Sequence, residues 1–351
     1  MRANRHVIVR VSAQTDVGRT RDHNEDTFLV ADLTKGTTDF LDGGTATVGP
    51  KGSLFLVADG MGGAAAGEIA SAMAADAVFQ HLRSTWTASG TDSPDDFTRH
   101  LREAVEVANE RIHRYALEHP DSRGMGTTAT VVGVVGGRLH LAQVGDSRAY
   151  LVRQGLAVQL TKDQSLIQRL IDAGELTEEQ AAQSERRNII LQALGPDATV
   201  RVDVTYQDIR RGDLLILCSD GLSGLVKRDE IAAVATGQPD VQAIGSRLIG
   251  MANERGGPDN ITVVAVRFED PGLAEPDGVA DLGYHAYPVP DAEAPGEVAA
   301  VEPPADDLPR ANDPAETAID SVIRRTGSPV VMAAVGIGIL LILLTLFLLI
   351  P

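Results

Sequence analysis

The stretch TATVVGVVGGRLHLAQVGDSRAYLVRQG, residues 128–155, contains three runs in which apolar and small or polar residues alternate. Alternation with a period of two is typical of β-strands. Gly136 and Gly137 separate the first two runs and predict a two-residue hairpin turn. Hairpin connections join antiparallel neighbours, so this stretch predicts an antiparallel sheet.

The rest of the first 268 residues extends this pattern. Strands are predicted at residues 6–15, 52–59 and 261–268, and amphipathic helices at residues 67–86 and 95–119. The strands come in runs and the helices come in runs, which favours separate layers over a parallel β–α–β order. We therefore predict an α+β fold of two packed antiparallel β-sheets flanked by helices, within a domain that covers residues 1–268.

Charge and cysteine content exclude several classes of protein. The formal net charge is −18, and residues 269–328 alone hold fourteen acidic residues against three arginines. The folded part is therefore only mildly acidic, and a basic surface for nucleic acid is not expected. Cys218 is the single cysteine, so an internal disulfide is impossible, and its apolar surroundings predict a buried, inert thiol.

The C-terminal part of the chain has a different composition. Residues 269–328 are rich in Pro, Ala, Asp and Glu and predict a disordered linker. Val330–Ile350 contains no charged residue and has the length of a transmembrane helix, so residues 329–351 are predicted to be a membrane anchor. Arg324 and Arg325 precede this span, and the N-terminus has no signal-peptide pattern. We therefore expect a single-pass protein of the cell membrane whose folded domain is cytoplasmic.

Acidic residues recur at the ends of the predicted strands. Asp59-Gly60 and Asp220-Gly221 each end an apolar run and precede a helix-like segment, so these pairs fit hairpin turns poorly. The other acids at such positions are Asp26, Asp146 and Asp259. Converging carboxylates suit Mg²⁺ or Mn²⁺, and two such ions can activate water and neutralise a phosphoryl group. Arg21, beside Asp26, is suited to bind the phosphate oxygens.

A nucleotide-binding loop is the rival explanation for GMGGAAAG, residues 60–67. The loop lacks the Gly-Lys-Ser/Thr ending of a P-loop, and a dinucleotide site would place Asp59 beside a pyrophosphate. Both observations favour the metal site.

Eight motifs in order resemble the PPM (PP2C-type) metal-dependent serine/threonine protein phosphatases, over residues 10–268. They are RDHNEDTF, LVADGMGG, GMGTTAT, VGDSRAYL, LTKDQS, NIILQALG, LLILCSDGL and GGPDNITVV. The resemblance implies an αββα sandwich with two or three Mn²⁺ or Mg²⁺ ions at one edge. It also implies a mobile flap over the site, formed by residues 161–195.

The resemblance also implies roles for individual residues. Asp59 would bridge both catalytic metals and the Gly60 carbonyl would bind one of them. Asp220 and Asp259 would bind the other, Asp26 would support both through their water shell with Glu25 beside it, and Arg21 would bind the substrate phosphate. Asp146 would form a third metal site with Asp220. The alternative for Asp146 is a strand-end carboxylate paired with Arg148.

Three positions depart from the family pattern. Met61 and Ala64 stand where many members carry His, so the general acid is not identified, and we expect His23 to be exposed rather than catalytic. The connection at residues 33–52 is long for a hairpin and is expected to be a flexible, lineage-specific loop.

Together these features predict a signalling enzyme that dephosphorylates phosphoserine and phosphothreonine in proteins by metal-assisted attack of water. The partners implied are phosphoproteins, in particular membrane-bound serine/threonine kinases and their substrates. A membrane-tethered pseudophosphatase or phosphoprotein-binding scaffold is the alternative, and the survival of Asp26, Asp59, Asp220 and Asp259 argues against it.

Overall fold

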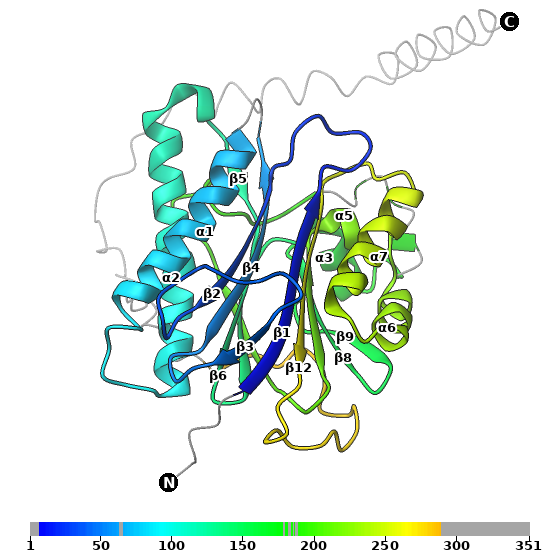
Figure 1. The fold of residues 1–351 in the computed structure, drawn as a ribbon. Coiled ribbons are helices and arrows are strands. Elements are labelled where there is room, and N and C mark those ends of the chain that lie inside the picture. The colour runs from blue at the N-terminus through cyan, green and yellow to red at the C-terminus, as the bar shows by residue number, and fades with distance from the viewer. Residues whose placement is uncertain are drawn as a thin grey trace, which may run out of the picture. The chain divides into compact units, whose positions relative to one another are not determined.

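The computed structural model describes residues 7–62, 66–177, 180–181, 184, 186 and 189–288. These form two antiparallel sheets packed face to face, with helices on both outer surfaces (Figure 1). The predicted sandwich is confirmed. The strands are β1 (Val7–Asp16), β2 (Asp26–Asp32), β3 (Thr45–Val48), β4 (Ser53–Met61), β5 (Gly126–Thr127), β6 (Ala129–Val135), β7 (Arg138–Val144), β8 (Arg148–Arg153), β9 (Leu156–Gln159), β10 (Asp203–Asp208), β11 (Leu214–Cys218) and β12 (Ile261–Phe268).

The helices lie outside the sheets because each carries one apolar face. The pair α1 and α2 covers one sheet, and α5, α6 and α7 cover the other. The helices are α1 (Ala66–Ser84), α2 (Pro94–Glu118), the 3₁₀ turn η1 (Pro120–Ser122), α3 (Leu166–Asp172), α5 (Asp220–Ser223), α6 (Arg228–Gly237) and α7 (Val241–Glu254).

The hydrogen-bonded strand pairs, all of them antiparallel, define the strand order in each sheet. One sheet has the order β3-β1-β12-β11-β8-β9 and the other the order β10-β7-β6-β4-β2, with β5 paired to β4. The predicted hairpin is present: Val135 pairs with Arg138, and both intervening glycines have positive φ. Positive φ at both turn positions is what a two-residue hairpin requires, and glycine adopts it without steric cost.

Three apolar clusters hold the layers together. One fills the space between the two sheets, and one lies under each helical layer. Cys218 is fully buried beneath the α5–α7 layer, and burial raises the pKa of its thiol to about 12. The prediction of a buried, inert cysteine is confirmed, because a thiol with so high a pKa forms very little thiolate.

Two sequence expectations need correction. The connection at residues 33–52 was expected to be a flexible loop, but it carries β3, which pairs with β1 and extends that sheet. Composition also predicted that a disordered linker begins at residue 269, yet residues 269–288 pack on the domain. Leu273 joins the core between the sheets, and Tyr287 N–H donates to the Val204 carbonyl at 2.8 Å. The predicted boundary at residue 268 is therefore too early, because residues 269–288 belong to the same compact unit as the sandwich.

The predicted membrane span, Val330–Ile350, lies outside the described residues, as does most of the predicted linker. None of the helices in the described part of the chain combines the length and the apolar character that crossing a bilayer requires.

Candidate active site

The two sheets bring five aspartates to one edge of the sandwich. Asp26 begins β2 and lies directly opposite Asp59 on β4. In the other sheet, β11 ends and β12 begins at the same edge, which places Asp220 near Asp259. Asp146 occupies the turn from β7 to β8 beside them. The structure therefore brings together the five carboxylates that the sequence analysis placed at strand ends.

Hydrogen bonds fix Asp26 between the two sheets. Its Oδ2 accepts from the Ser219 hydroxyl and the Thr262 hydroxyl, both at 2.7 Å. Ser219 follows β11 and Thr262 lies on β12, so a side chain of one sheet is held by the other. Its Oδ1 is buried and has no hydrogen-bond partner among the described residues.

The Asp59-Gly60 segment is held by β5 and the residue that follows it. The Asp59 N–H donates to the Thr128 hydroxyl at 2.9 Å, and the Asp59 carbonyl accepts from the Thr128 N–H at 2.9 Å. At Gly60, a side-chain Cβ would collide with the Gly67 carbonyl oxygen and lie 2.6 Å from the Glu25 carbonyl oxygen. Glycine is required there because two backbone segments approach it closely.

Asp146 is not paired with Arg148. The guanidinium of Arg148 binds Asp163 instead, with Nη2 2.6 Å from Oδ2. Asp146 is buried, and its Oδ1 has no hydrogen-bond partner among the described residues. The direct ion pair that the alternative expected is therefore not formed between these two residues, although the charge of Arg148 still opposes the rise in the pKa of Asp146.

The electrostatics of the cluster favour bound cations. Burial, followed by the charges of Asp220 and Asp259, raises the pKa of Asp26 to about 7. Burial and Asp220 likewise raise the pKa of Asp146 to about 7, and burial with neighbouring carboxylates raises the pKa of Asp59 and Asp220. Buried carboxylates that crowd together are costly unless a positive charge compensates them. The oxygen-only donor set and the two partnerless oxygens fit Mg²⁺ or Mn²⁺.

Arg21 lies at the exposed rim of this cluster. Its Nη2 is 2.8 Å from Oδ2 of Asp259, and about half of its side chain is accessible to solvent. A guanidinium with one side on the acids and the other toward solvent can reach the oxygens of an incoming phosphate. His23, nearby in the sequence, is exposed, as expected.

Asn260 is a positioning residue that sequence reasoning missed. Its side-chain amide donates to the carbonyls of Val17 and His23 at 3.0 and 2.9 Å, and its Oδ1 accepts from the Glu25 N–H at 2.8 Å. Three bonds from one side chain thus fix the loop that carries Arg21. The only signal in the sequence is that Asn260 adjoins Asp259.

The expected flap is described in part. Its helix α3 begins after Ser165, whose hydroxyl accepts from the Gln168 N–H, and Leu194 pairs with Thr127 next to the Asp59 segment. Ala64 lies outside the described residues, and Met61 ends β4.

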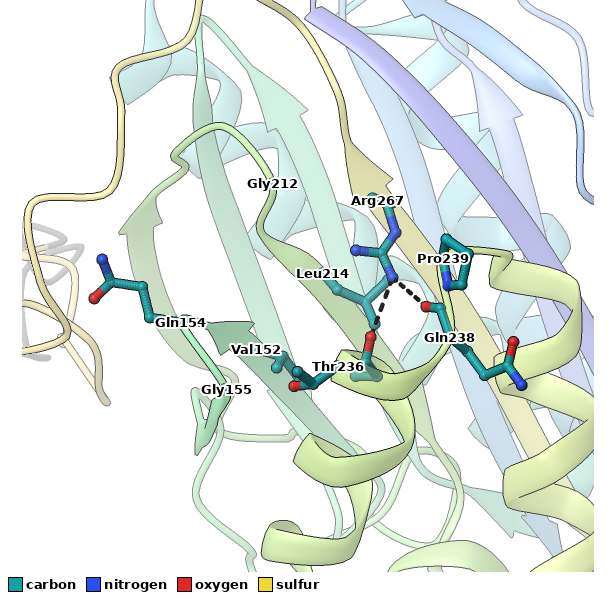
Figure 2. A pocket seen from close by; sticks show the side chains of 10 residues that line it. Val152, Gln154, Gly155, Gly212, Leu214, Thr236, Gln238, Pro239 and Arg267 are labelled. Atoms are coloured by element: carbon teal, nitrogen blue, oxygen red, sulfur yellow. Dashed lines mark hydrogen bonds between the residues drawn. The ribbon is translucent and has the colours of Figure 1, made fainter.

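A pocket of about 340 Å³ lies beside Leu214 and Arg267 (Figure 2). These residues are at the ends of β11 and β12 that face away from the acid cluster. Arg267 of β12 lines the pocket and donates from Nη2 to the carbonyls of Ala235 and Gln238 at the end of α6, at 3.3 and 3.0 Å. It has no carboxylate in its lining, so it is separate from the acid cluster.

An acid cluster suited to divalent cations, with a guanidinium at its rim, is the arrangement of a metal-dependent phosphatase. A family model described as protein phosphatase 2C matches residues 39–258. The serine/threonine phosphatase Stp of Listeria innocua is 36% identical over 253 residues, covering 72% of this chain and 93% of that protein.

A mycobacterial relative and two of its solved structures also indicate this family. The serine/threonine protein phosphatase PstP of Mycobacterium tuberculosis is 37% identical over 265 residues, which are 75% of this chain and 46% of PstP. Its crystal structure has a TM-score of 0.63 at 36% identity and covers 75% of this chain and 100% of that chain. A second structure, of the PstP catalytic domain with two manganese ions, has a TM-score of 0.61 at 35% identity, covering 75% of this chain and 100% of that chain.

The chain belongs to the PP2C family. It is a metal-dependent serine/threonine protein phosphatase that uses Mn²⁺ or Mg²⁺, as the sequence predicted.

Proposed function

We propose that the acid cluster is the catalytic centre and that its residues divide the work as follows. Asp59 and the Gly60 carbonyl would hold two cations, with Asp220 and Asp259 completing the site of one of them. Asp26 would keep the cluster together across the sheets, through the Ser219 and Thr262 hydroxyls. The observation that carries this assignment is the convergence of buried carboxylates with two partnerless oxygens at one sheet edge.

Each group of this chain then has a definite task. Bound cations would neutralise the charge of the phosphoryl group and lower the pKa of the water that attacks the phosphorus. Arg21 binds and orients the phosphate, since its guanidinium lies at the rim and is partly free of the acids. Asn260 keeps the Arg21 loop in place, and the Thr128 contacts keep the Asp59 backbone in place.

We propose Asp146 as a ligand of a third cation, shared with Asp220. Its burial, its partnerless Oδ1 and the charge of Asp220 beside it support this role. The charge of Arg148 compensates Asp146 only in part, because that guanidinium is ion-paired with Asp163.

The test of the site is Asp59→Ala, with Asp39→Ala, an exposed aspartate outside the cluster, as matched control. Asp59→Ala should remove nearly all hydrolysis of p-nitrophenyl phosphate at saturating Mn²⁺ while circular dichroism shows a folded protein. Near-normal turnover by the folded variant would exclude the assignment. A wild-type protein without turnover in Mn²⁺, yet able to bind phosphopeptides, would instead support a phosphoprotein-binding scaffold.

We also propose that the enzyme acts at the cell membrane and opposes serine/threonine kinases there. Val330–Ile350 has no charge, and 21 residues at about 1.5 Å each match a bilayer core of about 30 Å. Arg324 and Arg325 favour a cytoplasmic position for the catalytic domain. Tethering would raise the local concentration of membrane-bound phosphoproteins around the enzyme.

Truncation tests the anchor. A chain ending at residue 290 retains the segment that packs on the domain, and should leave the membrane fraction while keeping its turnover on a small aryl phosphate. Full-length protein in the soluble fraction would refute the anchor.

A comparison of phosphoproteomes tests whether kinases are substrates. Cells that carry the Asp59→Ala enzyme should contain more phosphoserine and phosphothreonine on their serine/threonine kinases than cells that carry the wild-type enzyme. Unchanged kinase phosphorylation would refute that partner class.

A further inference from the structure

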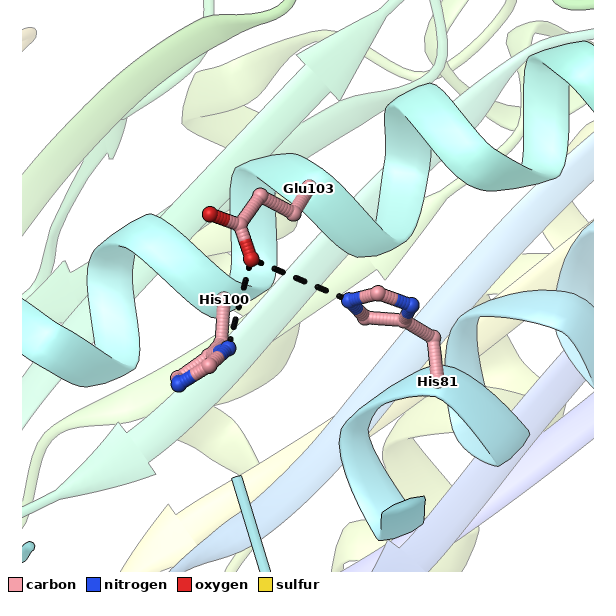
Figure 3. Close-up of side chains that lie close together, drawn as sticks. All are labelled: His81, His100 and Glu103. Atoms are coloured by element: carbon pink, nitrogen blue, oxygen red, sulfur yellow. Dashed lines mark ion pairs between the residues drawn. The ribbon is translucent and has the colours of Figure 1, made fainter. Parts of the chain in front are cut away.

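Two histidines and a glutamate meet on the α1–α2 pair (Figure 3). His81 lies in the last turn of α1, and His100 and Glu103 lie three residues apart on one face of α2. His81 is fifteen residues beyond Ala66, where α1 begins next to the Asp59-Gly60 segment. At about 1.5 Å per residue, this separates the group from that end of the helix by roughly 20 Å.

The three side chains point one ligand atom each toward a common centre. Glu103 Oε2 is 3.3 Å from His100 Nδ1 and 3.9 Å from His81 Nε2, and all three atoms lie within 4.8 Å of one another. Ligand atoms of a tetrahedral zinc ion, with bonds of about 2.1 Å, are separated by about 3.4 Å. Small side-chain rotations therefore suffice to reach that spacing.

The two imidazole nitrogens lack hydrogen-bond partners. His81 Nε2 and His100 Nδ1 are both buried, and within the described residues neither makes a hydrogen bond of acceptable geometry, although both lie within ion-pair distance of Glu103 Oε2. A buried polar atom without a partner is destabilising, so each such atom needs an explanation. A cation between them satisfies both nitrogens and the carboxylate at once.

The surroundings prepare these groups as ligands. Arg99 donates from Nη1 to the other oxygen of Glu103 at 3.2 Å, which leaves Oε2 directed at the histidines. Burial is the main cause that lowers the pKa of His81, and neutral imidazole is the form that binds a metal. Glu103 is about one-third exposed, so solvent can reach the group and supply a further ligand.

We propose that His81, His100 and Glu103 form a second type of metal site, which binds one zinc-like divalent cation and joins α1 to α2. Imidazole nitrogens select late first-row cations over Mg²⁺ and Mn²⁺, whereas the aspartate-only cluster suits the latter. The protein would then hold two kinds of ion at once, one kind for hydrolysis and the other for stability of the helical layer.

The experiment is a Zn²⁺ titration of the full-length protein, against a chromogenic chelator and in a large excess of Mg²⁺. Wild type should bind one zinc equivalent under these conditions, and Asp59→Ala should still bind it because that variant alters only the acid cluster. His81→Gln and, independently, Glu103→Gln should weaken binding by at least about 100-fold. His119→Gln, which changes an exposed histidine at the end of α2, is the matched control and should bind like wild type.

Two further readouts distinguish the site from a merely structural histidine pair. Zn²⁺ should raise the unfolding temperature of wild type but not of His81→Gln, and both should hydrolyse p-nitrophenyl phosphate equally in Mn²⁺. Co²⁺ in place of zinc should give the intense visible absorption of a low-coordinate nitrogen-containing site, and His81→Gln should lose it. Zinc binding that is absent in wild type, abolished by Asp59→Ala, or retained in both His81→Gln and Glu103→Gln would overturn the proposal.

Discussion

Replacing Asp26 by Asn should stabilise the metal-free protein while impairing catalysis. The amide retains an oxygen that can accept from the Ser219 and Thr262 hydroxyls. It removes a negative charge that burial and the neighbouring aspartates make unfavourable. The same charge is useful only when cations occupy the cluster, so stability and activity should respond in opposite directions.

The size of the effect follows from the pKa of Asp26, which rises from 3.8 to about 7 on folding. The metal-free folded state therefore binds this proton more tightly than the unfolded state. Its stability falls as the pH rises from about 4 to about 7, and the full loss is present above 7. Roughly three pKa units correspond to about 4 kcal/mol. We expect Asp26→Asn to gain up to about 4 kcal/mol at pH 8 and under about 2 kcal/mol at pH 5.

Urea denaturation in a strong chelator at both pH values measures this gain, and p-nitrophenyl phosphate hydrolysis in Mn²⁺ measures the loss of function. Asp39→Asn, which changes an exposed aspartate, controls for the loss of one charge. If metal-free Asp26→Asn were less stable than wild type at pH 8, the Asp26 charge would not be the costly feature, and the electrostatic argument for the cation site would fail.

Three further predictions concern single side chains. Arg21→Ala should lower kcat/KM about 10- to 100-fold, mainly through KM, because a charge-assisted bond to phosphate is lost; a collapse of Mn²⁺ affinity in calorimetry would instead make Arg21 a counter-ion of Asp259. Asp146→Ala should slow turnover on phosphoprotein and retain two bound ions, and full activity at every Mn²⁺ concentration would contradict the third site. Arg153→Met leaves the buried carboxylate of Asp213 without its guanidinium partner and should cost about 3–5 kcal/mol in urea denaturation; a loss under 1 kcal/mol would show that the pair contributes little.

Much of the fold was predictable because its determinants are local. Strand alternation, the Gly136-Gly137 turn and the aspartates at strand ends are visible within about ten residues each, and antiparallel order then brings the strand ends to shared edges. The positions of Asp26 and Asp59 follow from this logic, since their strands pair in register.

The contacts that hold the site in place were not predictable in the same way. Ser219 and Thr262 reach Asp26 from about two hundred residues away, through the packing of one sheet on the other. Asn260 looks like an ordinary polar residue until the loop before β2 folds onto it. Composition likewise concealed the packing of residues 269–288, because the ion pair between Asp281 and the buried Arg153 forms only in the tertiary structure.

The last described segment also covers the edge of one sheet. β10 is the outermost strand of its sheet, and an uncovered edge strand is a template for pairing with another chain. Residues 285–287 occupy that edge: the Tyr206 N–H donates to the His285 carbonyl at 3.1 Å, and Thr205 bridges to Ala286. Ending the chain at residue 268 would bare these backbone groups, so such a fragment should aggregate through β10, whereas a chain that ends at 290 keeps its edge closed.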